Sequence, residues 1–149
     1  MLSKKISGYT FKSPILTASG TYGYGDEVKD IVEVDKLGGI VTKSVTLHPR
    51  EGNPPPRIAE TNSGMLNSIG LANVGVNEFC EKKIPYLNKL KNNIIINIAG
   101  SKIDDYVQTL TMLENSSGNH IGYEINISCP NVKEGGMEFG VNAKTTEKL

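Results

Sequence analysis

The stretch that decides the fold runs from residue 94 to residue 127 and reads IIINIAGSKIDDYVQTLTMLENSSGNHIGYEINI. It opens with an apolar run, Ile94 to Ala99, that is typical of a buried strand. An amphipathic helix is predicted over Lys102 to Leu113, and a second strand over Tyr123 to Ile127. A strand, a helix and a strand in this order predict parallel pairing, because parallel strands need a long crossover connection. The helix should bury one stripe, made of Ile103, Tyr106, Val107, Leu110 and Leu113.

The same alternation extends toward the N-terminus. Two further strands are predicted at Pro14 to Ala18 and at Ile40 to Val45, both apolar and the second rich in β-branched residues. Helices are predicted at Asp26 to Leu37 and at Val76 to Leu90, and Pro85 should kink the second of them. The chain therefore carries about four strand and helix repeats.

These repeats predict an α/β fold with a parallel sheet, because strands that are apolar on both faces are covered on both sides. A short N-terminal hairpin is expected over Lys5 to Phe11, and a last helix from about Asn142. The alternation alone fits both half of a TIM (β/α)8 barrel and an open doubly wound sheet. A complete barrel takes about 250 residues. Since this chain has 149, we expect a single domain over residues 1–149 that holds fewer units.

Composition argues against several classes of protein. Sixteen basic residues balance sixteen acidic ones, so no net charge favours nucleic acid or an anionic membrane surface. No apolar run is long enough to span a membrane and no signal-peptide core precedes the domain, so we expect a cytoplasmic protein. Cys80 and Cys129 form no cluster with metal-ligand spacing, and no metal site is expected. The sequence contains no GxGxxG, Walker A or HExxH motif.

Polar residues end every predicted strand, which is where parallel α/β sheets bind their ligands. An uncompensated buried ammonium is costly, so we expect Lys43 to face an anion or a water-filled mouth of the sheet. The alternative is a lysine at the strand end that reaches solvent. The strand ends together supply Ser19, Gly20, Lys43, Ser44, Asn97, Gly100, Asn126, Ser128 and Cys129.

Asn97, Asn126, Cys129 and residues 64–71 each have a functional and a structural interpretation. The amides of Asn97 and Asn126 suit a planar heterocycle with carbonyl and N–H groups, but a satisfied asparagine in a strand-to-helix turn fits equally well. Cys129 lies just past a strand, where a thiolate can act as base or nucleophile; from the residues alone, a buried inert cysteine remains the alternative. Residues 64–71 predict either a backbone that approaches a flat ligand or an ordinary packed loop.

Several segments together resemble one enzyme family. The order and spacing are similar to those of the class 1 dihydroorotate dehydrogenases, and residues 58–61 and 64–67 look most like the NAD-linked class 1B. The resemblance spans nearly the whole chain and implies the N-terminal half of a TIM barrel. Its most specific piece is Asn126-Ile127-Ser128-Cys129-Pro130-Asn131; the others are Ser13-Pro14-Ile15, Ala18-Ser19-Gly20, Thr42 to Thr46, Gly52-Asn53-Pro54, Pro56-Arg57 and Asn67 to Leu71.

The resemblance implies oxidation of dihydroorotate to orotate in pyrimidine biosynthesis, with FMN across the barrel mouth. Cys129 would remove a proton from C5 of dihydroorotate, and Lys43 would stabilise charge on the reduced flavin and contact the orotate carboxylate. The pyrimidine would be bound by Asn67, Asn126 and Asn131, with backbone groups of Ile69, Gly70 and Leu71. The flavin would be lined by Ala18, Ser19, Gly20, Lys43, Ser44, Asn97 and Asn126.

The resemblance also implies partners. Class 1B enzymes work with a subunit that carries FAD and a [2Fe-2S] cluster and passes electrons to NAD, whereas class 1A enzymes share the cysteine and use fumarate. An open half-barrel exposes strand edges, which favours a homodimer, disorder or aggregation. Because strands five to eight are absent, we expect the 149-residue chain to be inactive alone. Two alternatives are a related flavin-dependent pyrimidine reductase, similar to dihydropyrimidine dehydrogenase, and a non-catalytic half-barrel that serves in assembly.

Overall fold

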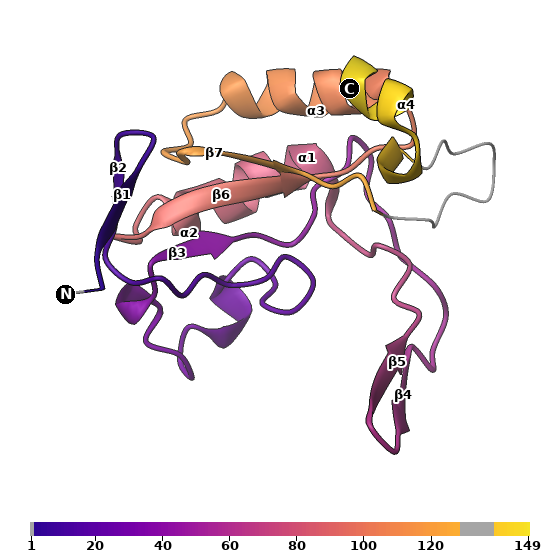
Figure 1. The fold of residues 1–149 in the computed structure, drawn as a ribbon, viewed down its shortest axis with the longest axis horizontal. Coiled ribbons are helices and arrows are strands. Elements are labelled where there is room, and N and C mark those ends of the chain that lie inside the picture. Colours follow the sequence, from indigo (N-terminus) through magenta and orange to yellow (C-terminus); the bar gives the residue numbers. More distant parts are fainter. Residues whose placement is uncertain (1, 129–138) are drawn as a thin grey trace.

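The computed structural model describes residues 2–128 and 139–149. Its centre is a three-stranded sheet in the order β3-β6-β7, with both neighbouring pairs parallel (Figure 1). The strands are β3 (Gly39–Val41), β6 (Asn93–Ile98) and β7 (Gly122–Ile125). The predicted α/β fold with parallel strands is confirmed, and the three strands overlap the last three that the sequence predicts.

The sheet and the helices share one apolar core. Ile40, Ile94, Ile96 and Ile98 are each at most 1% exposed, and they pack with side chains of the helices in one cluster. Burial of each isoleucine stabilises the fold by about 1.5–3 kcal/mol. Neighbouring β7 is only half-buried or exposed along its length, because it lies at the edge of the sheet.

The connection from β3 to β6 is helical but irregular. It consists of α1 (Gly75–Glu78), a π-helical segment η3 (Phe79–Lys83) and α2 (Ile84–Leu87). The irregularity predicted at Pro85 is present as the π-helical turn, which lies just before the proline. Pro85 has no N–H to donate to the preceding turn, and the wider π-helical turn accommodates that loss.

The connection from β6 to β7 is α3 (Ile103–Glu114), within one residue of the prediction. Asp105 caps its first turn, since its carboxylate accepts the backbone N–H of Ser101 at 2.9 Å and of Lys102 at 3.2 Å. One member of the predicted stripe is wrong: Val107 is 54% exposed, whereas Thr109 is fully buried. Val107 lies at the edge of this stripe, in an apolar groove beside the edge strand β7, so it remains exposed in the described part of the chain.

Two N-terminal predictions are wrong. Residues 26–37 do not form one helix; they contain two 3-10 turns, η1 (Asp26–Val28) and η2 (Val34–Lys36). Neither turn buries a residue and Ile31 is 83% exposed, so a helix there would have no apolar face to pack.

Residues 14–18 form only a single parallel bridge, from Leu16 to Gly39, in place of the predicted strand. The hydroxyl of Thr17 both accepts from the N–H of Val41 at 2.9 Å and donates to its carbonyl at 3.0 Å. Together with two backbone hydrogen bonds, from Gly38 to Ile15 at 2.8 Å and from Thr17 to Gly39 at 3.4 Å, this side chain holds the segment alongside β3.

Two hairpins and a last helix complete the described chain. The predicted N-terminal hairpin is confirmed, with Ser7 and Gly8 both at positive φ in its turn. The second hairpin was expected only as part of a loop, and it projects from the body of the molecule (Figure 1). The elements are β1 (Lys4–Ile6), β2 (Tyr9–Phe11), β4 (Ile58–Thr61), β5 (Gly64–Asn67), η4 (Phe139–Val141) and α4 (Ala143–Lys148). The last helix begins next to Asn142, as predicted, and the Asn142 side chain caps it.

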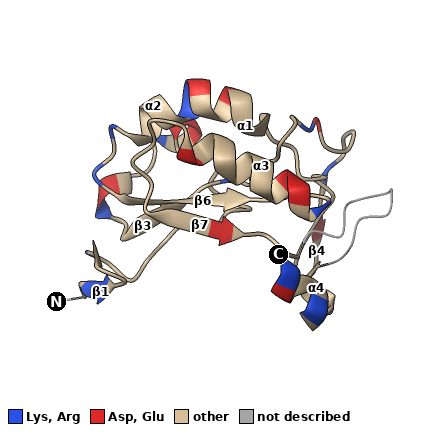
Figure 2. Ribbon diagram, turned by 90° about the horizontal axis from the view of Figure 1, so that it is seen from above, with Lys and Arg blue, Asp and Glu red and all other residues tan. Residues whose placement is uncertain are grey.

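The strands of the sheet follow one another in chain order. The bridged segment at Leu16, then β3, β6 and β7, follow one another in chain order without reversal. Right-handed crossovers that always advance in the same direction place their helices on one face, whereas a doubly wound sheet reverses direction and covers both. Figure 2 shows α1, α2 and α3 on one side of the sheet, and α1 contacts α3. Half a barrel has this order, and so does each half of a doubly wound sheet before its point of reversal.

Candidate active site

Two adjoining cavities lie at the carboxyl ends of the parallel strands. The first encloses about 400 Å³ and the second about 280 Å³, and Ser19 lines both. The first is also lined by Gly20, Thr21, Gly23, Lys43, Ser44, Asn67, Ile69, Gly70 and Leu71. The second is also lined by Asn97, Glu124, Ile125, Asn126, Ile127 and Ser128. Most of the predicted site residues are thereby brought together at one edge of the sheet.

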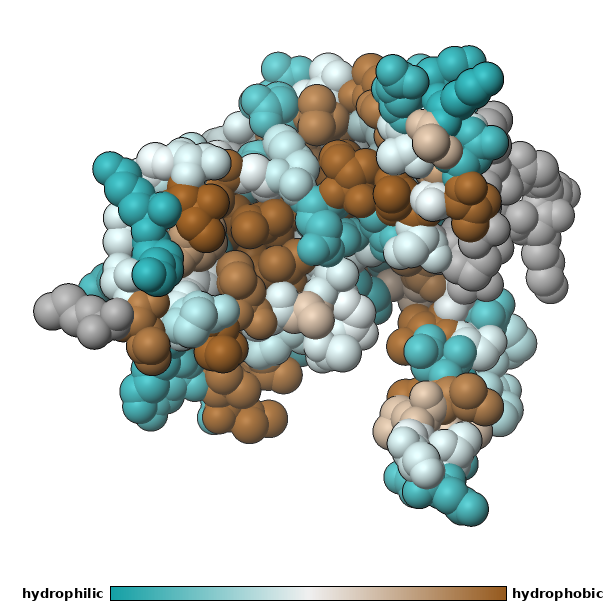
Figure 3. Space-filling view, viewed as in Figure 1, coloured by the Kyte–Doolittle hydropathy of each residue, from teal (hydrophilic) through white to brown (hydrophobic). Residues whose placement is uncertain are grey.

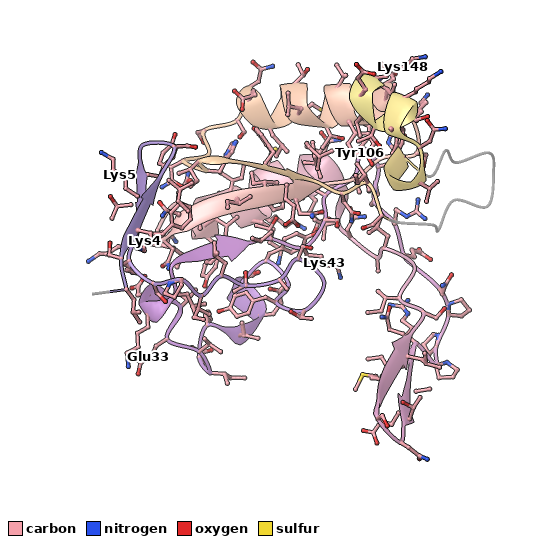
Figure 4. All side chains as sticks on the ribbon, viewed as in Figure 1. Lys4, Lys5, Glu33, Lys43, Tyr106 and Lys148 are labelled. Atoms are coloured by element: carbon pink, nitrogen blue, oxygen red, sulfur yellow. The ribbon has the colours of Figure 1, made fainter. Side chains whose placement is uncertain are left out.

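Lys43 belongs to the first cavity. It leaves the end of β3, where its backbone N–H donates to the carbonyl of Gly23 at 2.8 Å, and its side chain lies in the region between the sheet and the projecting hairpin (Figure 4). The residue is half-buried, while the residues on either side of it are buried. Its ammonium can therefore meet a ligand in the cavity, as the site interpretation requires.

Asn126 and Ser44 link the outer strands across the end of β6. Nδ2 of Asn126 donates to Oγ of Ser44 at 3.2 Å, and Oδ1 of Asn126 accepts the N–H and the hydroxyl of Ser128, each at 3.2 Å. The carbonyl of Asn126 accepts from the hydroxyl of Tyr106 at 2.6 Å. One asparagine thus fixes the turn that follows β7.

Asn97 and Glu124 form a hydrogen-bonded pair. The sequence predicted Asn97 as a site residue but not Glu124. Asn97 is 1% exposed, and its Nδ2 donates to Oε1 of Glu124 at 2.5 Å. Its Oδ1 is buried and has no hydrogen-bond partner among the described residues. Glu124 was missed, although a carboxylate inside an otherwise apolar strand is the signal that could have revealed it.

The loop after β5 forms the opposite wall, and its backbone comes close to that of a neighbouring loop. Gly70 has φ 73°, and a Cβ built there would lie 2.8 Å from the backbone nitrogen of Asn53. Leu71 adopts φ 57°, which is uncommon for a residue with a side chain. Only glycine fits at position 70, and the pair places backbone groups at the cavity surface.

Asn73 holds this loop in place and was not predicted. It is 8% exposed, and its Nδ2 donates to the carbonyl of Leu71 at 2.9 Å. Its Oδ1 accepts the N–H of Gly75 at 2.9 Å, and the hydroxyl and N–H of Thr46 at 3.0 and 3.2 Å. A single buried amide therefore connects the loop, the chain after β3 and the start of α1.

The wall that contains Gly20 and Gly23 is anchored from the helical side. Nζ of Lys83 in η3 lies 2.7 Å from the carboxylate of Asp26; burial opposes ionisation of Asp26, but its contact with Lys83 prevails and lowers its pKa. Tyr24 packs on Phe79 with ring centroids 5.3 Å apart, and burial raises the pKa of Tyr24 to about 12. The hydroxyl of Tyr24 donates to the carbonyl of Ser44 at 3.4 Å, which ties this wall to the end of β3.

Of the predicted site residues that the structure describes, Ala18 and Gly100 do not line these cavities. Ala18 is exposed and flanks the wall next to Ser19. Cys129 and Asn131 lie outside the described residues. Within residues 2–128 and 139–149, no group of three His, Cys, Asp or Glu side chains is arranged to hold a metal ion. In the same ranges no helix has both the length and the apolar character needed to cross a membrane.

Comparison with known proteins finds relatives that carry one and the same name. Three bacterial proteins, each named dihydroorotate dehydrogenase B (NAD(+)), catalytic subunit, are similar to this chain. The protein of Bacteroides thetaiotaomicron is 51% identical over 148 residues, which are 99% of this chain and 48% of that protein. Those of Thermoanaerobacter pseudethanolicus and Geobacter sulfurreducens are 47% and 46% identical, over 95% and 96% of this chain and 46% and 47% of theirs. The chain thus spans about half the length of the curated relatives it matches.

A solved structure supports the fold. The crystal structure of the dihydroorotate dehydrogenase of Eimeria tenella in complex with ferulenol superimposes with a TM-score of 0.67, over 89% of this chain and 38% of the other, at 24% identity. The sequence model for dihydroorotate dehydrogenase matches residues 1–149 in full. The chain therefore belongs to the dihydroorotate dehydrogenase family.

Proposed function

We propose that this chain supplies the flavin face and part of the pyrimidine pocket of a class 1B dihydroorotate dehydrogenase. The reaction is the oxidation of dihydroorotate to orotate in pyrimidine biosynthesis, with NAD as the final acceptor. One observation carries the proposal. Lys43 lines a cavity of about 400 Å³ together with the turn at Ser19 and Gly20 and the loop from Asn67 to Leu71. These are the segments on which the family resemblance rests, and they converge from distant parts of the chain.

The residues around the two cavities fit FMN. A flat ring system needs close backbone approach and a few directed polar groups. Here Gly20 has no atom within 4 Å of a built Cβ, and the buried Oδ1 of Asn97 lacks a hydrogen-bond donor among the described residues. We infer that Ser19, Gly20, Ser44, Asn97 and Asn126 hold the flavin, with Ala18 at its edge. Bound FMN would supply the hydride acceptor for C6 of dihydroorotate.

Lys43 contributes charge to this site. Its ammonium would attract the carboxylate of dihydroorotate and stabilise the negative charge that develops as the flavin is reduced. Asn67, with backbone groups of Ile69, Gly70 and Leu71, would bind the pyrimidine from the opposite wall of the same cavity. Cys129 and Asn131 are proposed, from the resemblance alone, as the base for C5 and as a further pyrimidine ligand.

We also propose that residues 1–149 are the N-terminal half of one TIM-barrel domain. The uninterrupted strand order supports this, and so does the exposed edge strand β7. A small apolar groove of about 110 Å³ beside β7 and α3 is lined by Ile98, Tyr106, Val107, Leu110, Ile125 and Leu149. Figure 3 shows apolar side chains gathered in this region. In a barrel the next strand and helix would cover this surface.

The proposed partners follow from the same family. The relatives are named catalytic subunits, which supports a complex with an electron-transfer subunit that carries FAD and a [2Fe-2S] cluster. A homodimer and a cytoplasmic location complete the proposal. Copurification of an iron-sulfur flavoprotein would support NAD as the acceptor, whereas direct reduction of fumarate would contradict it.

A complementation experiment tests the function. Residues 1–149 are mixed with the second half of the Bacteroides thetaiotaomicron relative, and the complex is assayed for flavin absorbance and for dihydroorotate oxidation. We expect both in the complex and neither in residues 1–149 alone. A soluble complex without flavin or activity would contradict the proposal. Uracil bound in preference to orotate would favour the dihydropyrimidine dehydrogenase type of reductase instead.

A further inference from the structure

We propose that Glu124 is a positioning residue that turns the carbonyl oxygen of the Asn97 side chain toward an N–H group of the bound flavin. This inference rests on the proposed function and adds a residue to it. It begins with the register of the sheet, in which Asn97 of β6 and Glu124 of β7 are directly paired. Paired residues on neighbouring strands project to the same face, and here the two side chains meet at 2.5 Å.

The chemistry of Glu124 fixes the orientation of the Asn97 amide. An ionised carboxylate can only accept hydrogen bonds, so the group that faces it must be the NH₂ of the amide. The two ends of an asparagine amide are otherwise nearly isosteric, and a neutral partner would tolerate either orientation. With Nδ2 committed to Glu124, Oδ1 must point the other way.

The other end of the amide lacks a donor. Oδ1 of Asn97 is buried without a partner among the described residues, on a side chain that is 1% exposed. A nearby hydroxyl does not satisfy it, because Oγ1 of Thr42 donates its proton to the carbonyl of Lys43 at 3.1 Å and accepts the backbone N–H of Asn97 at 3.2 Å. An unpaired buried acceptor is costly, and a ligand that donates there would remove the cost.

Asn97 and Glu124 line the same cavity, so a ligand bound there would supply the hydrogen-bond donor that Oδ1 of Asn97 lacks. It lies next to the larger cavity, with Ser19 in both walls. The oxidised isoalloxazine ring carries a single ring N–H, at N3, and carbonyl groups on either side of it. An acceptor held in one orientation therefore selects the N3–H of the flavin. If the amide were free to turn, its NH₂ would instead face that N–H and repel it.

A double-mutant cycle tests this role in the complemented enzyme, with the FMN dissociation constant as readout. We expect Glu124→Ala to weaken FMN binding about 10-fold, the effect typical of one lost hydrogen bond to a buried group. Asn97→Ala should weaken it by a similar factor. In the Asn97→Ala background, Glu124→Ala should have no further effect, because Glu124 acts only through Asn97. Additive losses would overturn the inference.

Two further variants sharpen the test. Glu124→Gln can accept from or donate to the amide, so it should bind FMN with an affinity between those of the parent and Glu124→Ala. Glu81→Ala, an exposed glutamate on η3, is the matched control and should leave the dissociation constant unchanged. A ligand without the N3 proton, 3-methyl-FMN, should bind the parent about 10-fold more weakly than FMN does. The parent and Glu124→Ala should bind 3-methyl-FMN with equal affinity. A difference in affinity between them would overturn the inference.

A measurement on residues 1–149 alone separates failure of this inference from failure of the proposed function. If the parent complex binds no FMN, the proposed function fails. The side-chain amide of Asn97 can still be followed by ¹⁵N NMR in the parent and in Glu124→Ala. Asn97 amide resonances that move in Glu124→Ala, and stay in place in Glu81→Ala, would support the orienting contact. Resonances that do not respond would overturn it.

Discussion

The side-chain amide of Asn126 donates a hydrogen bond to Oγ of Ser44 at 3.2 Å, although 82 residues separate the two in sequence. Ser44 is 5% exposed and follows β3, whereas Asn126 follows β7, so the bond spans the end of β6 between them. The strand ends that carry Lys43 and Asn97 are thereby held at a fixed spacing. A hydrogen bond within the protein therefore fixes the strand ends that form the site.

Ser44→Ala should destabilise the chain by about 1 kcal/mol, because it leaves the half-buried Nδ2 of Asn126 without this acceptor. Urea unfolding at neutral pH measures the loss. Ser44→Thr restores the hydroxyl and is the matched control, with a smaller loss expected. Equal stability of the alanine variant and the parent would mean that the hydrogen bond contributes nothing to the fold.

Lys43→Met should lower kcat/KM for dihydroorotate about 100-fold or more in the complemented enzyme, because methionine keeps the length of the side chain but removes the charge. FMN content should change little if the other cavity residues hold the cofactor. Steady-state kinetics and flavin absorbance measure the two effects.

Lys43→Arg separates charge from shape, since it keeps the positive charge and should retain more activity than methionine. Loss of flavin from the methionine variant, with normal turnover by the molecules that retain it, would contradict the proposed role. Lys43 would then act only in cofactor retention.

Asn73 offers a test of how the loop from Asn67 to Leu71 is positioned. Asn73→Ala should destabilise the chain by about 2 kcal/mol, because the buried N–H groups of Thr46 and Gly75 lose their acceptor. Orotate affinity of the complemented enzyme should fall as well, since the carbonyl of Leu71 loses its donor.

Asn73→Asp is the informative partner of that variant. A carboxylate still accepts from Thr46 and Gly75 but cannot donate to Leu71. It should therefore lower orotate affinity with a smaller loss of stability than alanine causes. If both properties fall in parallel in the two variants, Asn73 acts on the fold as a whole and not on the loop.

The fold could be predicted where local pattern and tertiary burial coincide. The apolar runs at β3 and β6 and the periodicity of α3 reflect side chains that the core buries, such as Ile96, Tyr106 and Leu113. The predicted helix at residues 26–37 failed because its spacing of apolar residues had no sheet face to pack on, and Ile31 remains 83% exposed. Local periodicity gives no information on whether such a face exists.

The hairpin of β4 and β5 was missed for the opposite reason. All eight of its strand residues are exposed, so its sequence has no alternation between a buried and a solvent face. Glu124 and Asn73 were missed because the role of each depends on the residues to which it hydrogen-bonds in the folded chain. The pairing of Glu124 with Asn97 depends on the register of β6 and β7, and that register is set by tertiary structure.

A final prediction concerns His120, which lies outside the proposed site. Nε2 of His120 lies 2.5 Å from the hydroxyl of Tyr123, and that hydroxyl donates to Glu114. The Tyr123 hydroxyl is thus an acceptor toward His120, so Nε2 carries the proton of a neutral ring. Nδ1 is buried without a partner in the described part of the chain, and a Cβ on Gly118 would lie 2.7 Å from it.

Burial lowers the pKa of His120 below its ordinary value of 6.5, although the charge of Glu114 opposes this shift. A group whose pKa is lower in the folded state contributes stability above its unfolded pKa. That contribution is lost as the pH falls through 6.5 toward the folded value, because the unfolded chain binds the proton first. The chain should therefore lose stability between pH 7.5 and 5.5, by less than about 1.4 kcal/mol per pH unit from this one group.

His120→Gln should flatten that part of the profile, since glutamine does not titrate, and urea unfolding at several pH values measures it. His48→Gln, at an exposed histidine, is the matched control for loss of a histidine. Equal changes in the two variants would show that the pH dependence has another origin. A parent that gains stability on acidification, with the gain lost in His120→Gln, would contradict the buried, neutral ring, because His120 would then bind its proton more tightly in the folded chain.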